Sequence, residues 1–319
     1  MPTLSDVAKV ANVSKMTVSR VINHPEQVTE ELRELVYAAM TELDYRPNKV
    51  AKALAQNRTL VVKVMILEEL DTTEPYYMNL LIGIANELNN NHYALQLVTP
   101  YSNDRTECDG FIIMGMREED YAWIAEIDKP VVLFGENDYG FNYVDSDNRE
   151  GTRKATSYAI ANGYSKIVFI GIDVDARFER SREQGYLEAM ESAGLQTEII
   201  RFGNHSTHSR NFIRENLAHY PKDTCFVCSS DRLAIGVTTG IRQAGMRAPE
   251  DYGVIGFDGV FLDQISEPKL TTIKQDVYKI GESCAAVLLE KINYPDKEIE
   301  NIAFSPQLVI RNSTRVINK

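Results

Sequence analysis

The segment at residues 15–23 carries side chains that could read a nucleic acid. Helical spacing of 100° per residue gathers them within one arc of about 140°. They are Lys15, Met16, Ser19, Arg20 and Asn23. The opposite side of the same helix, which is suited to packing, holds Thr17, Val18, Val21 and Ile22. The guanidinium of Arg20 can bind a guanine edge, whereas Met16 offers only an apolar contact, for instance to a thymine methyl.

Two helices are needed to present that face, and the residues before it predict both. The apolar residues of the first helix recur at i, i+3, i+4 and i+7, and they are Leu4, Val7, Ala8 and Ala11. Thr3 stands at the N-cap with Asp6 three residues on, and Ser14 caps the second helix. A helix-turn-helix that lies in a major groove has this layout. The spacing of apolar residues by itself, however, occurs more often in an ordinary pair of amphipathic helices than in a DNA-binding motif.

The exact residues at positions 3–23 are more specific than their period. The stretch TLSDVAKVANVSKMTVSRVIN resembles the opening of the lactose-repressor (LacI/GalR) family of bacterial transcription regulators. That family typically begins T-L-x-D-V-A-x-x-A-x-V-S-x-x-T-V-S-R-V-L-N, and Ile22 here replaces the leucine. The resemblance implies a homodimeric regulator, most often a repressor, that binds pseudo-palindromic operator DNA. It adds Thr3, Ser14 and Thr17 to the residues expected to contact DNA.

A third helix closes the predicted DNA-binding domain at residues 1–47. Residues 29–43 combine a capping threonine, an acidic first turn and an apolar stripe, which together predict a helix. The sequence DYRP at residues 44–47 ends it, because the residue before a proline is disfavoured in helical conformation.

Residues 48–59 are predicted to join this head to the rest of the chain. The stretch NKVAKALA at residues 48–55 is too short for an independent helix in water, so the residues alone favour a plain linker. The resemblance implies instead a hinge that becomes helical on DNA. Asn48 and Ala51 would then contact DNA, and Leu54 would insert as an apolar wedge into the minor groove.

From residue 60 onward, apolar strands alternate with amphipathic helices. The predicted strands lie at residues 60–67, 93–98, 110–114, 131–134, 166–171, 224–228 and 252–257. The predicted helices lie at residues 76–90, 149–162, 181–193, 208–219, 230–244 and 276–292. Such alternation predicts parallel sheets with crossover helices, and two sets predict two Rossmann-like lobes. The expected fold class is therefore a small all-α helix-turn-helix head joined by a hinge to an α/β core.

The resemblance implies that this core, residues 60–319, is periplasmic-binding-protein-like and carries the effector site and the dimer contacts. The first lobe is expected at about 60–145 plus 276–293, and the second at about 146–275 plus 294–315. One departure from the family lies at residues 99–109, where eleven residues replace a full helix between two strands. Because a parallel crossover takes a dozen or more residues, the first lobe is expected to be trimmed on one face.

Ligands of open α/β sheets bind beyond the carboxyl ends of the strands, and the resemblance identifies candidates there. Tyr76 and Tyr77 are similar to the family's N-P-F-F signature, whose aromatics line the effector cleft. Arg182 in SREQGY and Asp258 in VIGFDG match the family's cleft arginine and strand-end aspartate. Facing each other across a cleft, these two groups can bind vicinal hydroxyls, so the expected effector is a sugar or glycoside. The structural alternatives are packing for the tyrosines and an interlobe salt bridge for Arg182 with Asp258.

Three further polar residues are candidates beside that cleft. Ser230, in SSDRLAIG, stands where the family usually has asparagine before a helix. His205, in FGNHS, lies near where some members place an aromatic over the ligand, although a surface histidine is the simpler interpretation. Gln275, in LTTIKQD, fits the last crossover between the lobes and has a purely structural alternative.

Catalytic and cofactor motifs are missing from the sequence. It has no G-x-G-x-x-G after a strand, no Walker A and no G-x-S-x-G, and His205 with His208 lacks a zincin's glutamate. Cys225 and Cys228 form a C-x-x-C on a predicted buried strand, where residues three apart point to opposite faces, so buried thiols are expected. We therefore expect no enzymatic activity, no cofactor and no metal. The alternative is a sugar-binding or sugar-processing α/β protein with an accessory DNA-binding head.

The charge is unevenly distributed along the 319 residues, whose formal net charge is -12. Residues 1–60 carry eight Lys and Arg against seven Asp and Glu, whereas the remaining residues carry 26 against 39. An acidic body behind a head with cations on one face suits a DNA binder whose larger domain does not adhere to DNA. There is no apolar signal peptide and no long apolar run, so a cytoplasmic, nucleoid-associated protein without membrane contact is expected.

Overall fold

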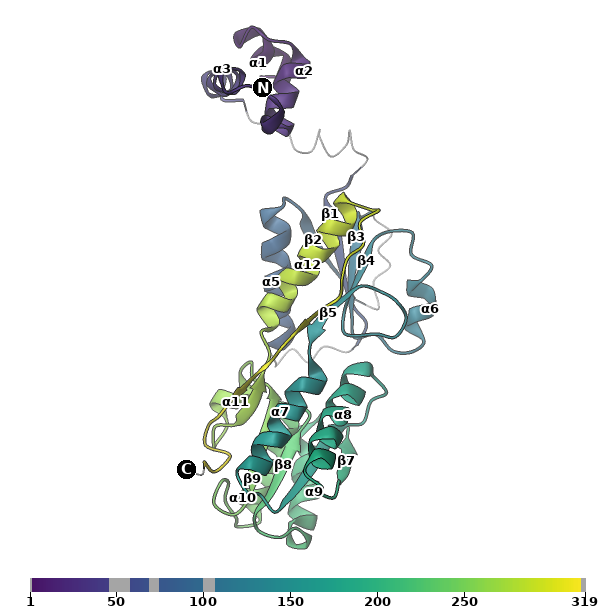
Figure 1. The fold of residues 1–319 in the computed structure, drawn as a ribbon, viewed down its shortest axis with the longest axis vertical. Helices are drawn as coiled ribbons and strands as arrows, with labels where there is room; N and C mark the ends of the chain where they lie inside the picture. Colours follow the sequence, from purple (N-terminus) through teal and green to yellow (C-terminus); the bar gives the residue numbers. More distant parts are fainter. Residues whose placement is uncertain (1, 46–57, 69–74, 100–106, 317–319) are drawn as a thin grey trace. The chain divides into compact units, whose positions relative to one another are not determined.

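The computed structural model describes residues 2–45, 58–68, 75–99 and 107–316. Contacts within the chain define two compact units, Met1–Thr59 and Leu60–Lys319, and each is described by itself (Figure 1). The predicted hinge residues Asn48, Ala51 and Leu54 lie outside the described ranges, and their roles stay predictions.

The first unit is a bundle of three helices. They are α1 (Leu4–Val10), α2 (Lys15–Asn23) and α3 (Glu30–Glu42), with a 3-10 turn, η1 (Pro25–Gln27), before the third. The side chains buried between them are Val7, Ala8, Ala11, Val18, Val21, Val36 and Ala39. The predicted helix-turn-helix is therefore confirmed, since both of its helices bury the apolar face that their spacing predicts.

Side-chain caps define where the first two helices begin. Asp6 accepts hydrogen bonds from the backbone N–H of Thr3 at 2.8 Å and from its hydroxyl at 2.7 Å. Ser14 Oγ accepts from the backbone N–H of Thr17 at 3.0 Å. Each cap satisfies a polar group that the first helical turn leaves without an intrahelical partner.

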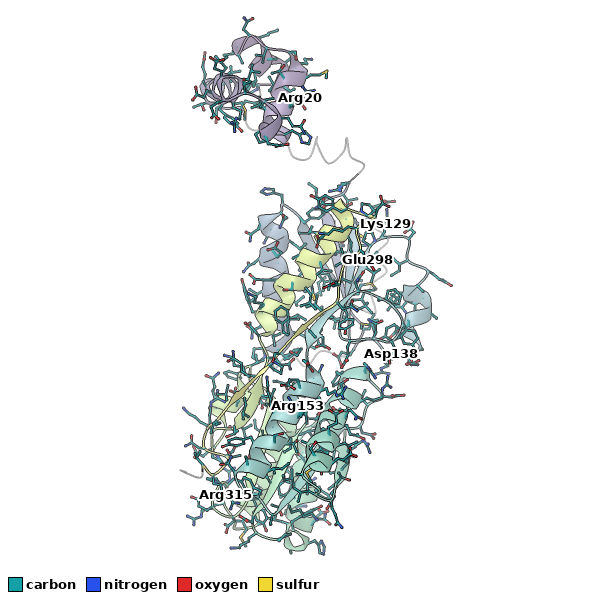
Figure 2. All side chains as sticks on the ribbon, viewed as in Figure 1. Arg20, Lys129, Asp138, Arg153, Glu298 and Arg315 are labelled. Carbon is teal, nitrogen blue, oxygen red and sulfur yellow. The ribbon has the colours of Figure 1, made fainter. Side chains whose placement is uncertain are left out.

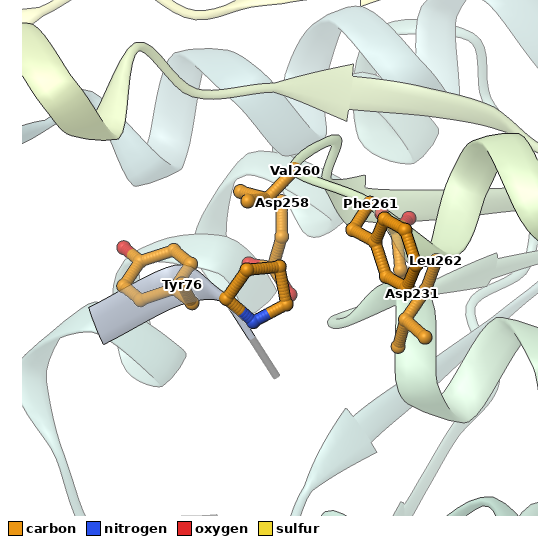
Figure 3. Close-up of a pocket in the computed structure, with 7 residues that line it drawn as sticks. Tyr76, Asp231, Asp258, Val260, Phe261 and Leu262 are labelled. Carbon is orange, nitrogen blue, oxygen red and sulfur yellow. The ribbon is translucent and has the colours of Figure 1, made fainter. Parts of the chain in front are cut away.

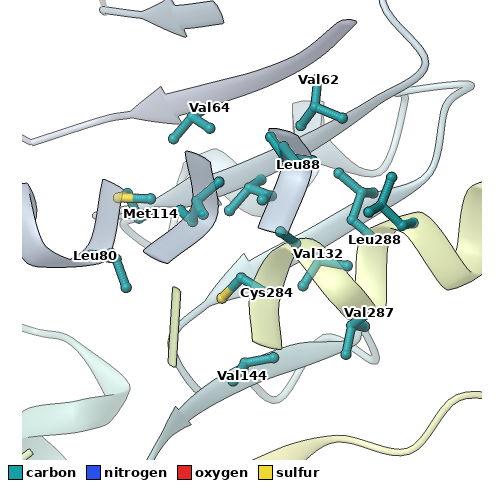
Figure 4. Close-up of a cluster of buried hydrophobic side chains, with 14 of the residues drawn as sticks. Val62, Val64, Leu80, Leu88, Met114, Val132, Val144, Cys284, Val287 and Leu288 are labelled. Atoms are coloured by element: carbon teal, nitrogen blue, oxygen red, sulfur yellow. The ribbon is translucent and has the colours of Figure 1, made fainter. Parts of the chain in front are cut away.

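The first lobe of the second unit is built on a parallel six-stranded sheet with the order β11-β5-β4-β3-β1-β2. Its strands are β1 (Val61–Ile66), β2 (Ala94–Val98), β3 (Gly110–Met114), β4 (Val131–Phe134), β5 (Tyr143–Ser146) and β11 (Ile302–Phe304). Helices α5 (Tyr76–Asn90) and α12 (Val277–Asn293) pack together over one face, where they bury the cluster drawn in Figure 4. Helix α12 thus returns to the first lobe, as predicted.

Two glycines allow α5 and α12 to approach closely. A Cβ atom at Gly83 would lie 2.1 Å from the carbonyl oxygen of Tyr278, and one at Gly281 would lie 2.2 Å from that of Leu80. Real Cβ atoms do not come that close to backbone oxygens, so a larger residue at either position would separate the helices.

The second lobe is built on a six-stranded sheet with the order β12-β10-β9-β8-β6-β7. Its strands are β6 (Lys166–Ile172), β7 (Ile199–Phe202), β8 (Thr224–Cys228), β9 (Gly253–Asp258), β10 (Thr271–Lys274) and β12 (Gln307–Val309), and only β12 runs antiparallel. Helices α7 (Asn148–Ala161) and α8 (Arg177–Ser192) pack over one face. Helices α9 (Ser206–Asn216) and α10 (Asp231–Gln243) pack over the other.

The two cysteines of the C-x-x-C lie on β8 and point to opposite faces of this sheet. Cys225 packs in the cluster under α7 and α8, whereas Cys228 packs in the cluster under α9 and α10. Burial raises the pKa of both thiols. The predicted orientation is therefore confirmed, and the two sulfur atoms cannot chelate one ion.

The structure differs from the sequence interpretation at several short elements. Strands β5, β7, β10, β11 and β12 were not predicted, because runs of three or four residues such as YVDS carry too little periodicity. Helix α8 begins at Arg177, four residues before the predicted start. Residues 302–304, which we expected in the second lobe, form β11 and pair with β5 in the first sheet.

The face of the first sheet opposite α5 and α12 is covered differently. Among the described residues, the helix that packs on this face is the five-residue α6 (Asp120–Ile124), whose Ile124 contacts Ile113 and Leu133. Of the shortened crossover at residues 99–109, positions 100–106 lie outside the described ranges, so the predicted trimming stays a prediction. None of the helices described is long and apolar enough to cross a membrane.

Candidate nucleic-acid interface and effector cleft

Helix α2 presents the predicted polar face to solvent. Met16 is 73% exposed, and Lys15 and Arg20 are exposed as well, whereas Val18 and Val21 are fully buried (Figure 2). Neither Lys15 nor Arg20 forms an ion pair with any residue that the structure describes, so both charges are available to a partner. Long donors of this kind, held by a braced helix, can bind phosphates and base edges.

The other DNA-contact candidates of the head lie at the start of its helices. Thr3 and Ser14 are exposed N-cap residues whose side chains are hydrogen-bonded to their own helices. Thr17 and Ser19 are half-buried. Their predicted DNA contacts, like that of Asn23, stay predictions.

In the core, polar side chains of both lobes meet beyond the carboxyl ends of the strands. Tyr76, at the start of α5, donates its phenolic hydrogen to Gln275 Oε1 at 3.4 Å. Gln275, which follows β10, donates from Nε2 to Asp258 Oδ1 at 3.0 Å. This chain of contacts joins the first lobe to the second, and it gives Gln275 a bridging role.

Arg182 lies next to Asp258, and each nitrogen of its guanidinium group has a polar neighbour. Its Nε donates to Asn148 Oδ1 at 2.9 Å, and its Nη1 donates to the carbonyl oxygen of Ser229 at 2.6 Å. Its Nη2 lies 4.0 Å from Asp258 Oδ1, and the guanidinium stacks 3.8 Å from the centre of the Phe257 ring. Only 6% of the residue is exposed.

The predicted geometry of Arg182 and Asp258 is therefore wrong in one respect. Both residues belong to the second lobe, Arg182 on α8 and Asp258 on β9, so they do not face each other across the cleft and form no interlobe salt bridge. Their partner from the first lobe is Tyr76, which reaches Asp258 through Gln275.

Asp258 ends β9 with an unusual backbone conformation. Its φ is 115°, in a region that L-residues rarely adopt. Beside it, buried Asp231 accepts hydrogen bonds from Thr272 Oγ1 at 2.6 Å and from the backbone N–H of Gly259 at 2.9 Å. Burial, and then the charge of Asp258, raise the pKa of Asp231 well above its ordinary value. Strain and like charges in one place are typical of a binding site.

A second group of polar residues, which sequence reasoning missed, follows β4 and β5. Asp145 accepts from the backbone N–H groups of Glu136 at 3.1 Å and of Ser146 at 2.6 Å, and from Asn148 Nδ2 at 3.1 Å. Burial raises its pKa to about 6. Since Asn148 also binds Arg182, the two groups form one network. These residues would have been candidates if β5 had been predicted, because Asp145 and Ser146 are the last two residues of that strand.

A small pocket opens where the lobes meet. Its lining residues are Pro75, Tyr76, Asp231, Asp258, Val260, Phe261 and Leu262 (Figure 3). Its volume of about 20 Å³ has room for roughly one water molecule. A sugar ring therefore fits only if the side chains or the lobes around this pocket move apart.

The remaining predicted residues do not line this pocket. Tyr77 packs edge-on against Tyr76 at 5.7 Å, and its hydroxyl donates to Glu68. Ser230 Oγ donates to Asn204 Oδ1 at 2.7 Å and caps α10 by accepting from the backbone N–H of Leu233. His205 is exposed and packs edge-on against His208, which suits the simpler interpretation of a surface histidine.

A helix-turn-helix head followed by a two-lobed periplasmic-binding-protein-like core is the architecture of an effector-responsive DNA-binding regulator. Two family profiles match this order of domains. One, described as "Bacterial regulatory proteins, lacI family", matches residues 3–48. The other, described as "Periplasmic binding protein-like domain", matches residues 156–314.

Individual relatives agree with these profiles over the whole chain. The HTH-type transcriptional regulator YvdE of Bacillus subtilis (strain 168) is 52% identical over 315 residues, covering 98% of this chain and 100% of YvdE. The HTH-type transcriptional repressor PurR of Vibrio vulnificus (strain CMCP6) is 30% identical and is aligned over 100% of both chains. A solved structure of the transcriptional regulator CelR in complex with cellobiose has a TM-score of 0.74 at 28% identity, covering 98% of this chain and 100% of CelR. The chain belongs to the LacI family of bacterial transcriptional regulators.

Proposed function

We propose that this regulator is a repressor whose affinity for operator DNA is controlled by a sugar or glycoside bound between the two lobes. PurR, at 30% identity, is named a repressor, and the CelR structure, at 28% identity, holds cellobiose. PurR therefore supports the proposed repressor activity, and CelR supports the proposed sugar effector. We also propose that the chain has no enzymatic activity and works in the cytoplasm at the chromosome.

The observation that carries the proposal is the contact chain from Tyr76 through Gln275 to Asp258. It ties the first lobe to the second at the pocket that a ligand would enter. A ligand that replaces these contacts with its own hydroxyl groups favours one relative orientation of the lobes. It can shift that equilibrium only by its preference for one orientation, and such coupling is typically about 1–3 kcal/mol.

On the DNA side, we propose that two copies of α2 read two half-sites of a pseudo-palindrome, which requires a homodimer. The core offers exposed apolar side chains on α5 that a second copy could cover, since Met78 is 58% and Ile82 is 43% exposed. The hinge residues Asn48, Ala51 and Leu54 would pair as short helices only when the two first lobes hold them close, and this step transmits the lobe orientation to DNA affinity.

The test is selection of bound sequences from a random DNA pool with the full-length chain, followed by titration of neutral sugars into the complex. We expect a pseudo-palindromic consensus, and one sugar that changes the retained fraction of DNA without being consumed. Retention without sequence preference would contradict the regulator. Turnover of a bound sugar would instead support a sugar-processing protein with an accessory head.

A further inference from the structure

Carboxyl groups of both lobes belong to the polar network beside the pocket, and Asp231 and Asp258 line the pocket itself. Those of the first lobe are Glu136 and Asp145, and those of the second lobe are Glu179, Asp231 and Asp258. Burial raises the pKa of the carboxyl groups of Glu136, Asp145, Glu179 and Asp231. The charge of Glu136 raises the pKa of Asp145 further, and the charge of Asp258 raises the pKa of Asp231 further. A negative charge on Asp145 or on Asp231 is therefore already disfavoured by a neighbouring carboxylate.

The arginines beside these groups are already engaged. Arg182 donates to Asn148 and Ser229 and lies 4.0 Å from Asp258, as described above. Arg177 Nε lies 3.7 Å from Glu136 Oε2 and 3.6 Å from Asp138 Oδ1, and these ion pairs connect α8 to the loop after β4. Each arginine therefore already lies close to a carboxylate of the protein, which offsets part of its positive charge.

No lysine or arginine lines the pocket among the residues that the structure describes. The described lining therefore supplies no cation that could hold an anionic ligand.

Two buried polar atoms in the same network lack a hydrogen-bond partner. They are Glu136 Oε1 and Ser146 Oγ, and neither contacts a partner within the described part of the chain. Ser146 is only 3% exposed, and both residues donate their backbone N–H groups to Asp145. An unpaired buried polar atom costs free energy, so each of these two atoms would be stabilised by a hydrogen-bond partner that the described residues do not supply.

We propose that the cleft selects an uncharged, hydroxyl-rich ligand and rejects anionic sugars, namely sugar phosphates and sugar acids. The polar side chains that line the pocket are the carboxyl groups of Asp231 and Asp258 and the phenol of Tyr76, and carboxylate oxygens accept hydrogen bonds from the hydroxyl groups of a neutral polyol. A phosphate group would add negative charge beside carboxylates in a site of low dielectric constant, where Coulomb repulsion is strong. This inference rests on the proposed function, because it specifies the chemistry of the same site.

The test uses the full-length chain and a panel of neutral mono- and disaccharides, each paired with its 6-phosphate. Calorimetry measures affinity, and retention on operator DNA measures the response. We expect a neutral sugar to bind and its phosphate to bind at least about 100-fold more weakly. A phosphate that binds as well as its neutral partner, or better, overturns the inference but leaves the sugar response intact. If no member of the panel binds or changes DNA retention, the proposed function fails as well.

A pair of variants tests the source of the selectivity. Glu136→Gln removes one carboxylate with little change of shape, and we expect it to narrow the ratio between neutral and phosphorylated affinities at least about threefold. Glu191→Gln removes the same charge on the exposed last turn of α8 and is expected to leave the ratio unchanged. If Glu136→Gln does not fold, Asp145→Asn replaces it, because this change removes the other carboxyl group of the first lobe and is expected to narrow the same ratio. An unchanged ratio in each folded cleft variant overturns the proposal.

Discussion

Arg20 in the head and Arg182 in the core are used in opposite ways. Arg20 is exposed on α2 and has no ion pair among the residues described, so its charge is left for a partner. Arg182 is 6% exposed, and its donors bind Asn148 and Ser229 of the same lobe. The head therefore presents the charge of Arg20 to solvent, whereas the core uses the charge of Arg182 to hold neighbouring side-chain and backbone groups in place.

Among the substitutions that distinguish the core from the head, Arg182→Ala is expected to lower the free energy of unfolding most. The change leaves two buried acceptors and Asp258 uncompensated, and breaking a buried ionic network by removing one partner typically costs about 3–5 kcal/mol of unfolding free energy. Denaturant titration measures this loss, and we expect the response of DNA binding to the effector to disappear with it.

The matched control is Arg201→Ala, which breaks a more exposed pair with Glu183 and is expected to change the unfolding free energy by less than about 1 kcal/mol. Arg182→Lys keeps the buried charge but loses the forked geometry, so it serves if Arg182→Ala does not fold. A normal effector response in either Arg182 variant would contradict the role of this residue in the cleft.

The next effect concerns pH and the buried carboxyl of Asp145. Burial raises the pKa of Asp145 from its ordinary value of 3.8 to about 6, so between these two pH values the native state keeps a proton that the unfolded state has released. Stability from this group is therefore present below pH 3.8 and is lost as pH rises through 6, by about 3 kcal/mol in total. Relative to the native chain, Asp145→Asn should gain stability by up to that amount between pH 4 and pH 7.

The control for this pH dependence has the opposite sign. A hydrogen bond from Lys222 lowers the pKa of Asp251, so its stabilisation is present at neutral pH and is lost as pH falls through the lowered pKa. Asp251→Asn should therefore lose stability relative to the native chain as pH rises. The same trend with pH in both variants would contradict the assignment.

Arg20→Ala tests the head side of the comparison. Loss of a base-reading arginine typically costs about 1–3 kcal/mol of specific binding and relaxes one position of the site. Because Arg20 is exposed and unpaired within the described residues, the unfolding free energy should stay within about 0.5 kcal/mol of the native value. Unchanged affinity and sequence preference in a binding-site selection would remove Arg20 from the readout.

The smallest effect is expected from Ser14→Ala. Its hydroxyl accepts from the backbone N–H of Thr17 and defines the start of α2. Loss of an N-cap costs about 1 kcal/mol, which should appear in the unfolding of the head and as a weaker affinity for specific and random DNA alike. Thr29→Ala is a useful comparison, because Thr29 holds the N-cap position of α3 without a capping hydrogen bond and should cost less.

Local patterns in the sequence were enough to predict the helices and strands that have a clear period. Apolar spacing placed α1 and α2 and the outward face of α2, because a helix repeats every 3.6 residues wherever it is found. Alternating patterns gave the long strands and helices of both lobes. The two-residue period of a strand was enough to place Cys225 and Cys228 on opposite faces of β8.

The polar groups that meet in the cleft could not be paired from local sequence patterns. Tyr76 and Gln275 are 199 positions apart in sequence, and Arg182 and Ser229 are 47 apart, so no local period connects them. The short strands β5 and β11, which bring Asp145 and Ser146 to the cleft edge, are held by their neighbours in the sheet and carry little signal of their own. Hydrogen bonds between distant segments form only where packing brings them together, and this is why Arg182 binds Asn148 and Ser229 rather than facing Asp258 across the cleft.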